Sequence, residues 1–186
     1  MRGLVLAAGA GTRMARPKAM IADLRGRTWV ERAISALAQG GCDQISVALG
    51  AEVDRAEGVV RACGAEVVLV PDWAEGISAS VRAGLQAAAA AADSAALVVL
   101  LVDLPDVGAD VVRRVLTPIP DETTLRRAVY AGEPGHPVVI GRSHWDALDR
   151  SLHGDVGAGP YLRAHSAEPV DCSDLATGVD VDYPPA

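Results

Sequence analysis

The sequence predicts an α/β fold, with helices on both faces of an open, mostly parallel sheet in three layers. Short apolar runs alternate with amphipathic or alanine-rich stretches through the first two thirds of the chain, which is typical of successive strand–helix units. Half of the 186 residues are hydrophobic, yet only 3% are aromatic and none is phenylalanine. The core must therefore be built from valine, leucine, isoleucine and alanine, as in buried parallel strands. A chain of this length buries roughly 70% of its unfolded surface, so one domain over residues 1–186 is expected.

The strand–helix units follow one another in the order that this fold requires. A strand is expected at 3–7, then a helix at 29–38 that ends before Gly40 and Gly41, because glycine is favoured just past a helix C-terminus. The remaining units are a strand at 44–49, a helix at 54–61, a strand at 66–70 stopped by Pro71, a helix at 78–91, the most apolar strand at 97–102 and a helix at 110–116. Such units imply right-handed crossovers.

The pattern changes after Pro118, where proline and glycine become frequent. Two short strands at 126–130 and 138–140 are expected to form a small inserted β-ribbon. Short helices are expected at 145–152 and 161–165, and edge-like extended segments at 169–170 and 178–181.

The charge distribution narrows the class of ligand. The net charge is −7, but residues 1–32 hold seven basic groups against two acids, a balance of +5, which leaves −12 for the rest of the chain. A basic entrance in an acidic body suits a small polyanion such as a nucleoside triphosphate, whereas a long nucleic acid needs an extended positive surface. Nucleic acid is therefore not expected as a partner.

Neither a membrane nor an oxidising compartment is expected. The longest strongly apolar run, 95–102, is far too short to cross a bilayer, and residues 1–10 make a poor secretory signal. Cys42, Cys63 and Cys172 are widely spaced, with no CxxC or Cys/His metal spacing. They are expected to be reduced thiols of a cytoplasmic protein.

The first candidate site is the glycine-bearing loop 8–18, which follows the first strand. Gly9 and Gly11 leave their backbone N–H groups open to phosphate oxygens, and Lys18, the only lysine of the chain, stands at the end of the loop. The loop is not a dinucleotide fingerprint, because Met14 replaces the third glycine, nor a P-loop, because Ala19 follows Lys18. We expect a phosphate-binding loop.

The second candidate is Asp103, directly after the most apolar strand. A carboxylate at the end of a buried strand is costly unless it is paired or binds a cation, and Mg²⁺ favours one or two carboxylates together with phosphate oxygens. The alternative is that Asp103 caps the turn that follows.

The third candidate is the segment 73–85, in which small residues open a helix. Ser78 and Ser80 place short hydroxyls at the helix N-terminus, where a nucleoside base and ribose can approach, with Arg82 as a supporting residue. The alternative is that one of the two serines is only a helix cap.

These segments together resemble the molybdenum cofactor cytidylyltransferase branch of the nucleotidyltransferases, which have a glycosyltransferase-A-like, nucleotide-diphospho-sugar transferase-like fold. The matching motifs are LAAGAGTRMARPK (6–18), GISASVRAGL (76–85), VDLPDV (102–107), GHPVVI (135–140), GDVGAG (154–159) and GVDVDYP (178–184). The resemblance implies Mg²⁺-dependent transfer of CMP from CTP to the phosphate of a molybdopterin-type cofactor, with release of pyrophosphate. Ala8, in LAAG rather than LAGG, is associated with CTP in this branch.

The resemblance also implies roles for individual residues. Catalytic roles fall to Lys18, Arg13 and Asp103, and metal binding to Asp103 with Asp180 or Asp182. His136 would contact the acceptor. The nucleotide would be bound by Ala8, Gly9, Ala10, Gly11, Thr12, Arg13, Lys18, Ser78, Ser80 and Gly84. The implied partners are the nucleotide and a phosphorylated pterin-type acceptor, with a molybdoenzyme or its maturation chaperone as a further partner.

Some positions depart from the family pattern, and other functions stay open. Ala15 stands where glycine is usual, Ile77 where methionine is common and Gly159 where arginine often closes the GDxGAR motif. One alternative is the same chemistry on another phosphorylated acceptor, such as a sugar or a polyol; another is a non-catalytic carrier or chaperone of a nucleotide cofactor. A nicotinamide oxidoreductase is disfavoured by Met14 and by the lack of an acid about 20 residues past the loop.

Overall fold

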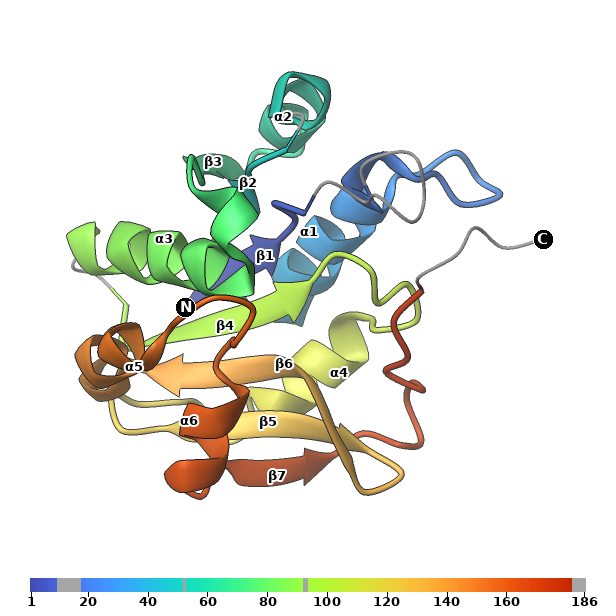
Figure 1. The fold of residues 1–186 in the computed structure, drawn as a ribbon. Helices are drawn as coiled ribbons and strands as arrows, with labels where there is room; N and C mark the ends of the chain where they lie inside the picture. The colour runs from blue at the N-terminus through green and yellow to red at the C-terminus, as the bar shows by residue number, and fades with distance from the viewer. Residues whose placement is uncertain (10–17, 52, 92–93, 182–186) are drawn as a thin grey trace.

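The computed structural model describes residues 1–9, 18–51, 53–91 and 94–181, and its centre is a seven-stranded sheet (Figure 1). The strand order is β3-β2-β1-β4-β6-β5-β7. The strands are β1 (Arg2–Leu6), β2 (Gln44–Leu49), β3 (Glu66–Leu69), β4 (Ala96–Leu101), β5 (Leu125–Tyr130), β6 (Glu133–Gly141) and β7 (Glu168–Asp171). β6 runs antiparallel to both of its neighbours, β4 and β5, and all other pairings are parallel. The mostly parallel sheet is confirmed.

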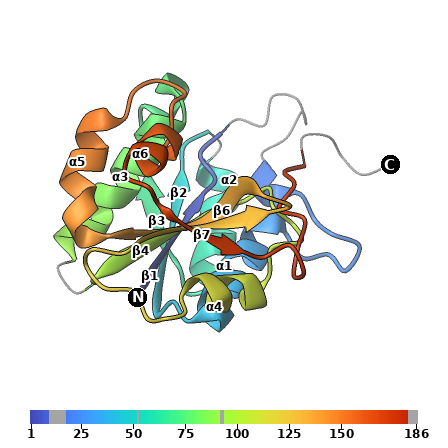
Figure 2. The same ribbon diagram turned by 90° about the horizontal axis from the view of Figure 1, so that it is seen from below.

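Helices cover both faces of the sheet, which gives the expected three layers (Figure 2). The helices are α1 (Trp29–Gly40), α2 (Val53–Ala62), α3 (Ile77–Ala90), α4 (Ala109–Val115), α5 (Trp145–Ser151) and α6 (Gly159–Ala164), with 3-10 turns η2 (Lys18–Met20), η3 (Trp73–Glu75) and η4 (Arg142–His144). One core cluster lies beneath α1, α2 and α4, and a second lies between the sheet, α3, α5 and α6. Within the described ranges, no helix combines the length and apolar character that a membrane span requires.

Local sequence explains where α1 begins and ends. Thr28 accepts a hydrogen bond from the backbone of Glu31, and the Glu31 carboxylate accepts one from the backbone of Thr28, which forms a capping box. At the other end, Gly41 has a φ of 116° and donates to the carbonyls of Ala38 and Leu37. The predicted helix over 29–38 is thus extended by two residues, to Gly40.

The expected β-ribbon does form, but it belongs to the main sheet. β6 is longer than the predicted strand over 138–140, and its residues 138–141 pair with residues 96–99 of β4. Val138, Val139 and Ile140 are all buried, so both faces of this stretch need cover, which only the sheet interior provides. The segment 178–181, expected to be extended and edge-like, forms no strand; it is held to the sheet by a bond from the Val181 amide to the Asp103 carbonyl.

Candidate active site

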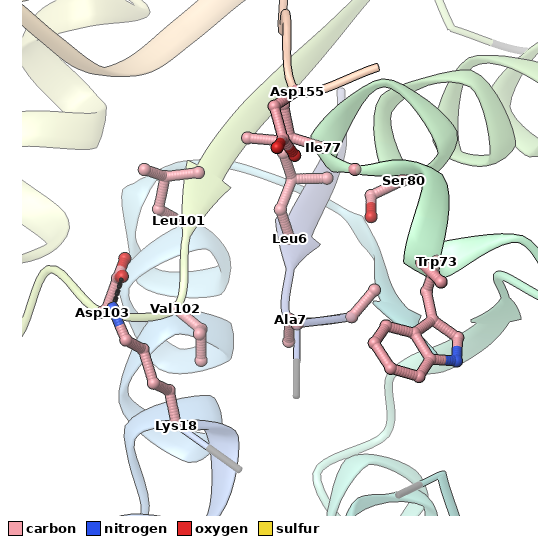
Figure 3. Close-up of a pocket in the computed structure, with 14 residues that line it drawn as sticks. Leu6, Ala7, Lys18, Trp73, Ile77, Ser80, Leu101, Val102, Asp103 and Asp155 are labelled. Carbon is pink, nitrogen blue, oxygen red and sulfur yellow. Dashed lines mark hydrogen bonds and ion pairs between the residues drawn. The ribbon is translucent and has the colours of Figure 1, made fainter. Parts of the chain in front are cut away.

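A cavity of about 430 Å³ opens beyond the carboxyl ends of β1 and β4, where the strand order reverses (Figure 3). This is the edge at which open parallel sheets bind ligands. Its walls come from the end of β1, the start of η2, the turn between η3 and α3, the end of β4 and the 154–159 loop. The residues that line it are Leu6, Ala7, Ala8, Gly9, Lys18, Trp73, Ala74, Gly76, Ile77, Ser80, Leu101, Val102, Asp103 and Asp155. We call it the nucleotide cavity below.

An ion pair between Lys18 and Asp103 stands at one side of this cavity. Lys18 Nζ lies 2.6 Å from Asp103 Oδ2, and the two side chains are 20% and 17% exposed (Figure 3). Lys18 is fixed by η2, whose next residue, Ala19, is buried in the core. Asp103 is fixed by β4, because the Val102 amide bonds to the Leu6 carbonyl across the sheet. Folding therefore brings together two groups that are 85 positions apart in the sequence.

The end of β1 forms the floor of the cavity. The amide of Ala7 donates to the carbonyl of Ala48, and the amide of Ala51 donates to the carbonyl of Ala8. The small side chains of Ala7 and Ala8 leave the floor open. Ala8, Gly9 and Lys18 line the cavity as expected, whereas the predicted nucleotide-binding residues Ala10, Gly11, Thr12 and Arg13 lie outside the described residues.

The helix α3 brings Ser80 to the cavity but not all of the expected residues. Ser78 is fully buried, its Oγ has no hydrogen-bond partner among the described residues, and its amide donates to the Gly154 carbonyl. Neither serine caps α3: the N-cap is Gly76, whose φ of 113° favours glycine.

The predicted nucleotide contact of Gly84 finds no support in this geometry. Gly84 packs on the sheet, and a Cβ there would lie 2.1 Å from Leu4 Cδ2, so close helix–strand packing accounts for this glycine. Arg82, expected to support the site, instead joins α3 to α5. Its guanidinium donates to Asp149 Oδ1 at 3.1 Å and to the Leu152 carbonyl at 2.9 Å.

Trp73 and Asp155 line the cavity, although the sequence predicted no individual role for either of them. Trp73, 36% exposed, forms the wall beside Ser80, and Asp155 lies beside Ile77 at the start of α3 (Figure 3). A Cβ at Gly76 would lie 2.3 Å from Asp155 Oδ1, so glycine at 76 is what lets the 154–159 loop approach α3. Asp155 belongs to the GDVGAG motif, and this motif could have pointed to it, although the aspartate was given no role in the sequence-based prediction.

The carboxylate oxygens of Asp103 suit a hard divalent cation, and the phosphate oxygens of a ligand would complete the coordination of that ion. Asp180 is exposed and precedes Val181, whose amide donates to the Asp103 carbonyl oxygen at 3.0 Å, so the backbone next to Asp180 contacts that of Asp103. Asp182 lies outside the described residues. In the part of the chain that the structure describes, no three histidine, cysteine or acidic residues group as a metal site. Mg²⁺ needs only one or two carboxylates when phosphate oxygens supply the rest.

His136, the predicted acceptor residue, lies in a second cavity that borders the first. This cavity measures about 110 Å³ and shares Leu6 and Ile77 with the nucleotide cavity. Burial, with a smaller effect of the Arg127 charge, lowers the pKa of His136 to about 4. The imidazole is therefore neutral near pH 7, and it can offer one donor and one acceptor but no charge.

Comparison with known proteins agrees with this geometry. The family model for the MobA-like NTP transferase domain matches residues 3–170. A nicotine blue oxidoreductase from Paenarthrobacter nicotinovorans is 36% identical over 193 residues, covering 97% of this chain and 91% of that protein.

Solved structures share the whole fold. Rv0371c from Mycobacterium tuberculosis H37Rv superposes with a TM-score of 0.79 at 30% identity, covering 99% of this chain and 94% of that one. Its complex with manganese gives a TM-score of 0.69 at 29% identity, over 97% and 92% of the two chains. A nucleotidyl transferase from Methanothermobacter has the same fold, with a TM-score of 0.79 at 20% identity over 98% and 91%. The chain therefore belongs to the MobA-like NTP transferase family and carries its nucleotidyltransferase domain.

Proposed function

We propose that this protein transfers CMP from CTP to the phosphate of a molybdopterin-type acceptor, with Mg²⁺, and releases pyrophosphate. The observation that carries the proposal is the Lys18–Asp103 pair at the switch point of the sheet, where a cation and a carboxylate face one cavity. A triphosphate needs the first group, and the cation that accompanies it needs the second.

The residues of this chain act by positioning and by charge. An oxygen of the acceptor phosphate attacks the α-phosphorus of CTP, a new P–O bond forms, and the bond to the β-phosphate oxygen breaks as pyrophosphate leaves. This displacement needs no protein nucleophile. The Lys18 ammonium neutralises negative charge on the phosphates, and the amides at the end of β1 orient them.

Asp103, with Asp180 or Asp182, would hold the Mg²⁺ ion, which supplies charge neutralisation at the phosphates when bound. Manganese in the structure of the Mycobacterium tuberculosis relative supports a divalent ion in this family. In the structure the Asp103 carboxylate forms an ion pair with Lys18. When a metal–triphosphate binds, Lys18 would pair with the phosphates and Asp103 with the metal ion, so neither charge would be left unpaired.

We place the cytidine between Ser80 and Trp73, away from the ion pair. Ser80 offers a short hydroxyl, and the half-exposed Trp73 indole offers a flat apolar face for a ring. Ala8, only 4% exposed at the cavity floor, is the residue that favours CTP in this proposal. We place the reaction in the cytoplasm, because Cys42, Cys63 and Cys172 are all free thiols.

The test is pyrophosphate release with each of the four nucleoside triphosphates, Mg²⁺ and molybdopterin-type cofactor. We expect release with CTP only, and loss of release when EDTA removes the metal. Release with another phosphorylated acceptor but not with the pterin would keep nucleotidyl transfer and overturn the acceptor. Tight CTP binding without release for any acceptor would instead indicate a carrier.

A redox reaction is the second candidate, because the 36% identical relative is named as an oxidoreductase acting on nicotine blue. A nicotinamide dinucleotide also carries a pyrophosphate, which the same phosphate-binding cavity would accept. Mixing the protein with NADH or NADPH and nicotine blue, and following absorbance, decides between the two. Dye-dependent oxidation of the dinucleotide without pyrophosphate release from any triphosphate would replace the first proposal by the second.

A further inference from the structure

Two neighbouring arginines of β5, Arg126 and Arg127, point to opposite faces of the sheet and differ in their partners. Arg126 donates from Nε to Glu168 Oε2 at 2.7 Å and from Nη1 to the Pro118 carbonyl at 2.6 Å. Arg127 has one weak bond, from Nη2 to the Gly135 carbonyl at 3.5 Å, and its buried Nε finds no acceptor among the described residues. Buried donors are nearly always paired, so the exception requires an explanation.

Arg127 lines the second cavity, to which the described residues contribute no acidic side chain. The cavity measures about 110 Å³, and its other walls are aliphatic side chains, His136 and the small residues Gly157, Ala158 and Gly159. Burial first, and then the charge of Arg163, lower the pKa of the Arg127 guanidinium. A guanidinium nevertheless stays protonated, so the cavity holds a positive charge with no carboxylate in its walls.

Arg163, which is exposed on α6, adds a second positive charge at this place. Its Nη1 lies 3.5 Å from the point where a Cβ at Gly159, a residue of the cavity wall, would stand, which is an ordinary van der Waals distance. Arg163 thus lies near the wall of the cavity without lining it, and each of the two arginines raises the cost of the other's charge. A bound anion would remove that cost and would satisfy the free Nε donor.

We propose that this second cavity is an oxyanion-binding subsite, in which Arg127 binds a phosphate or carboxylate group of a ligand and Arg163 stands beside the wall residue Gly159. The binding itself follows from the cavity alone. That the ligand is the second substrate rests on the proposed function, and it is supported by the walls at Leu6 and Ile77, which the two cavities share. Direct contact would make Arg127 a specificity-determining residue.

Calorimetric titration with phenyl phosphate, benzoate and the neutral probe benzyl alcohol tests the proposal. We expect phenyl phosphate or benzoate to bind and benzyl alcohol to bind much more weakly, and the stronger anion identifies the preferred oxyanion. Arg127→Met should weaken that binding roughly 10- to 100-fold, as the loss of charge-assisted hydrogen bonds does. Arg126→Met is the matched control, since it removes the adjacent arginine from the opposite face and should leave the affinity within about twofold of the wild type.

A direct measurement on the wild-type protein guards against a variant that fails to fold. The Nε–H resonance of Arg127 in a ¹H–¹⁵N spectrum should shift on addition of the anion and stay in place with benzyl alcohol. Arg163→Ala, an exposed change, should weaken binding severalfold. Unchanged affinity in folded Arg127→Met, or an Nε–H resonance that does not move, would overturn the proposal.

Failure of the subsite and failure of the proposed function give different results. Lys18→Ala should abolish pyrophosphate release and leave phenyl phosphate or benzoate binding at Arg127 intact. Anion binding that depends on Arg127 in a protein that releases no pyrophosphate would sustain the subsite and refute nucleotidyl transfer. Anion binding lost in Lys18→Ala but kept in Arg127→Met would place the anion in the nucleotide cavity and refute the subsite.

Discussion

The nucleotide cavity and the second cavity each present a cation, but they balance its charge differently. In the nucleotide cavity, built on the parallel half of the sheet, Lys18 is paired with Asp103 at 2.6 Å. In the second cavity, built beside the antiparallel strand β6, the described residues around Arg127 are aliphatic residues, His136 and small residues. Both cavities have a cation that could bind an anion, but among the described residues only the nucleotide cavity pairs that cation with a carboxylate whose lysine partner a metal ion could replace.

The difference follows from what each cavity must do. In a reaction at phosphorus, negative charge shifts from the attacking oxygen to the leaving group. The flexible Lys18 side chain can move with this charge once it has released Asp103. Recognition of a fixed oxyanion is better served by a planar guanidinium that is already dehydrated. We therefore expect substitutions in the first cavity to affect the rate and those in the second to affect affinity.

The largest expected effect is that of Lys18→Ala on turnover. Removing the ammonium should lower kcat by about 10²- to 10³-fold, as the loss of one preorganised charge donor does, while the Kd for CTP changes less than tenfold. Steady-state kinetics and equilibrium binding of CTP give the two numbers. Equal losses in kcat and in affinity for CTP would mean that Lys18 binds the nucleotide equally in the ground state and the transition state. Lys18 would then act on affinity, as we propose for Arg127.

The next effect concerns the other member of the pair. Asp103→Asn should lower kcat by about 100-fold and flatten its dependence on Mg²⁺ concentration, because the ligand for the ion is lost. Asp106→Asn is the matched control in the same turn: Asp106 accepts bonds from the Thr177 amide and hydroxyl, both at 2.6 Å, and does not line the nucleotide cavity. A full rate in Asp103→Asn would reduce Asp103 to a turn residue.

The parallel half of the sheet, β1 to β4, could be predicted from the sequence more fully than the half that contains β5, β6 and β7. In the parallel half, each apolar strand and amphipathic helix could be placed within about two residues, since local patterns decide both. The meeting of Lys18 with Asp103 also follows from topology, because the carboxyl ends of neighbouring parallel strands share one edge of the sheet. In the other half, β6 reads as a short, proline-interrupted strand, and its central place depends on long-range pairing with β4.

The residues missed at the sites have a common physical reason. Asp155 and Trp73 reach the nucleotide cavity only because loops pack closely at Gly76 and Gly50, where a Cβ would lie within 2.4 Å of a neighbouring side chain. Arg127 stands beside another arginine in the sequence, and nothing local distinguishes the two. Strand alternation sends them to opposite faces, but only the three-dimensional surroundings show which guanidinium has a buried Nε with no acceptor among the described residues.

The two arginines should differ in stability by a smaller amount. Arg126→Met leaves Glu168 and the Pro118 carbonyl without their donor and should lower the free energy of unfolding by about 2 kcal/mol. Arg127→Met removes a partly buried charge that has no acidic partner among the described residues, and it should leave that free energy within about 1 kcal/mol of the wild type, or raise it. Urea unfolding of both variants measures the difference. A larger loss of unfolding free energy for Arg127→Met than for Arg126→Met would mean that the Arg127 guanidinium stabilises the fold, which would contradict a role in anion binding alone.

The smallest expected effect is the response of the second cavity to pH. Because burial lowers the pKa of His136 to about 4, the unfolded chain binds more protons than the folded one between about pH 6.5 and 4. The stability that the neutral imidazole preserves is complete above pH 6.5 and is lost as the pH falls through this window, by about 1–2 kcal/mol in a half-buried position. Unfolding curves of the wild type and of His136→Asn should therefore diverge on acidification, whereas the exposed His153→Asn should follow the wild type. Because the Arg127 charge contributes to the lowered pKa of His136, saturating benzoate should reduce the difference between the unfolding curves of the wild type and His136→Asn. A difference that benzoate leaves unchanged would mean that His136 does not sense an anion bound at Arg127.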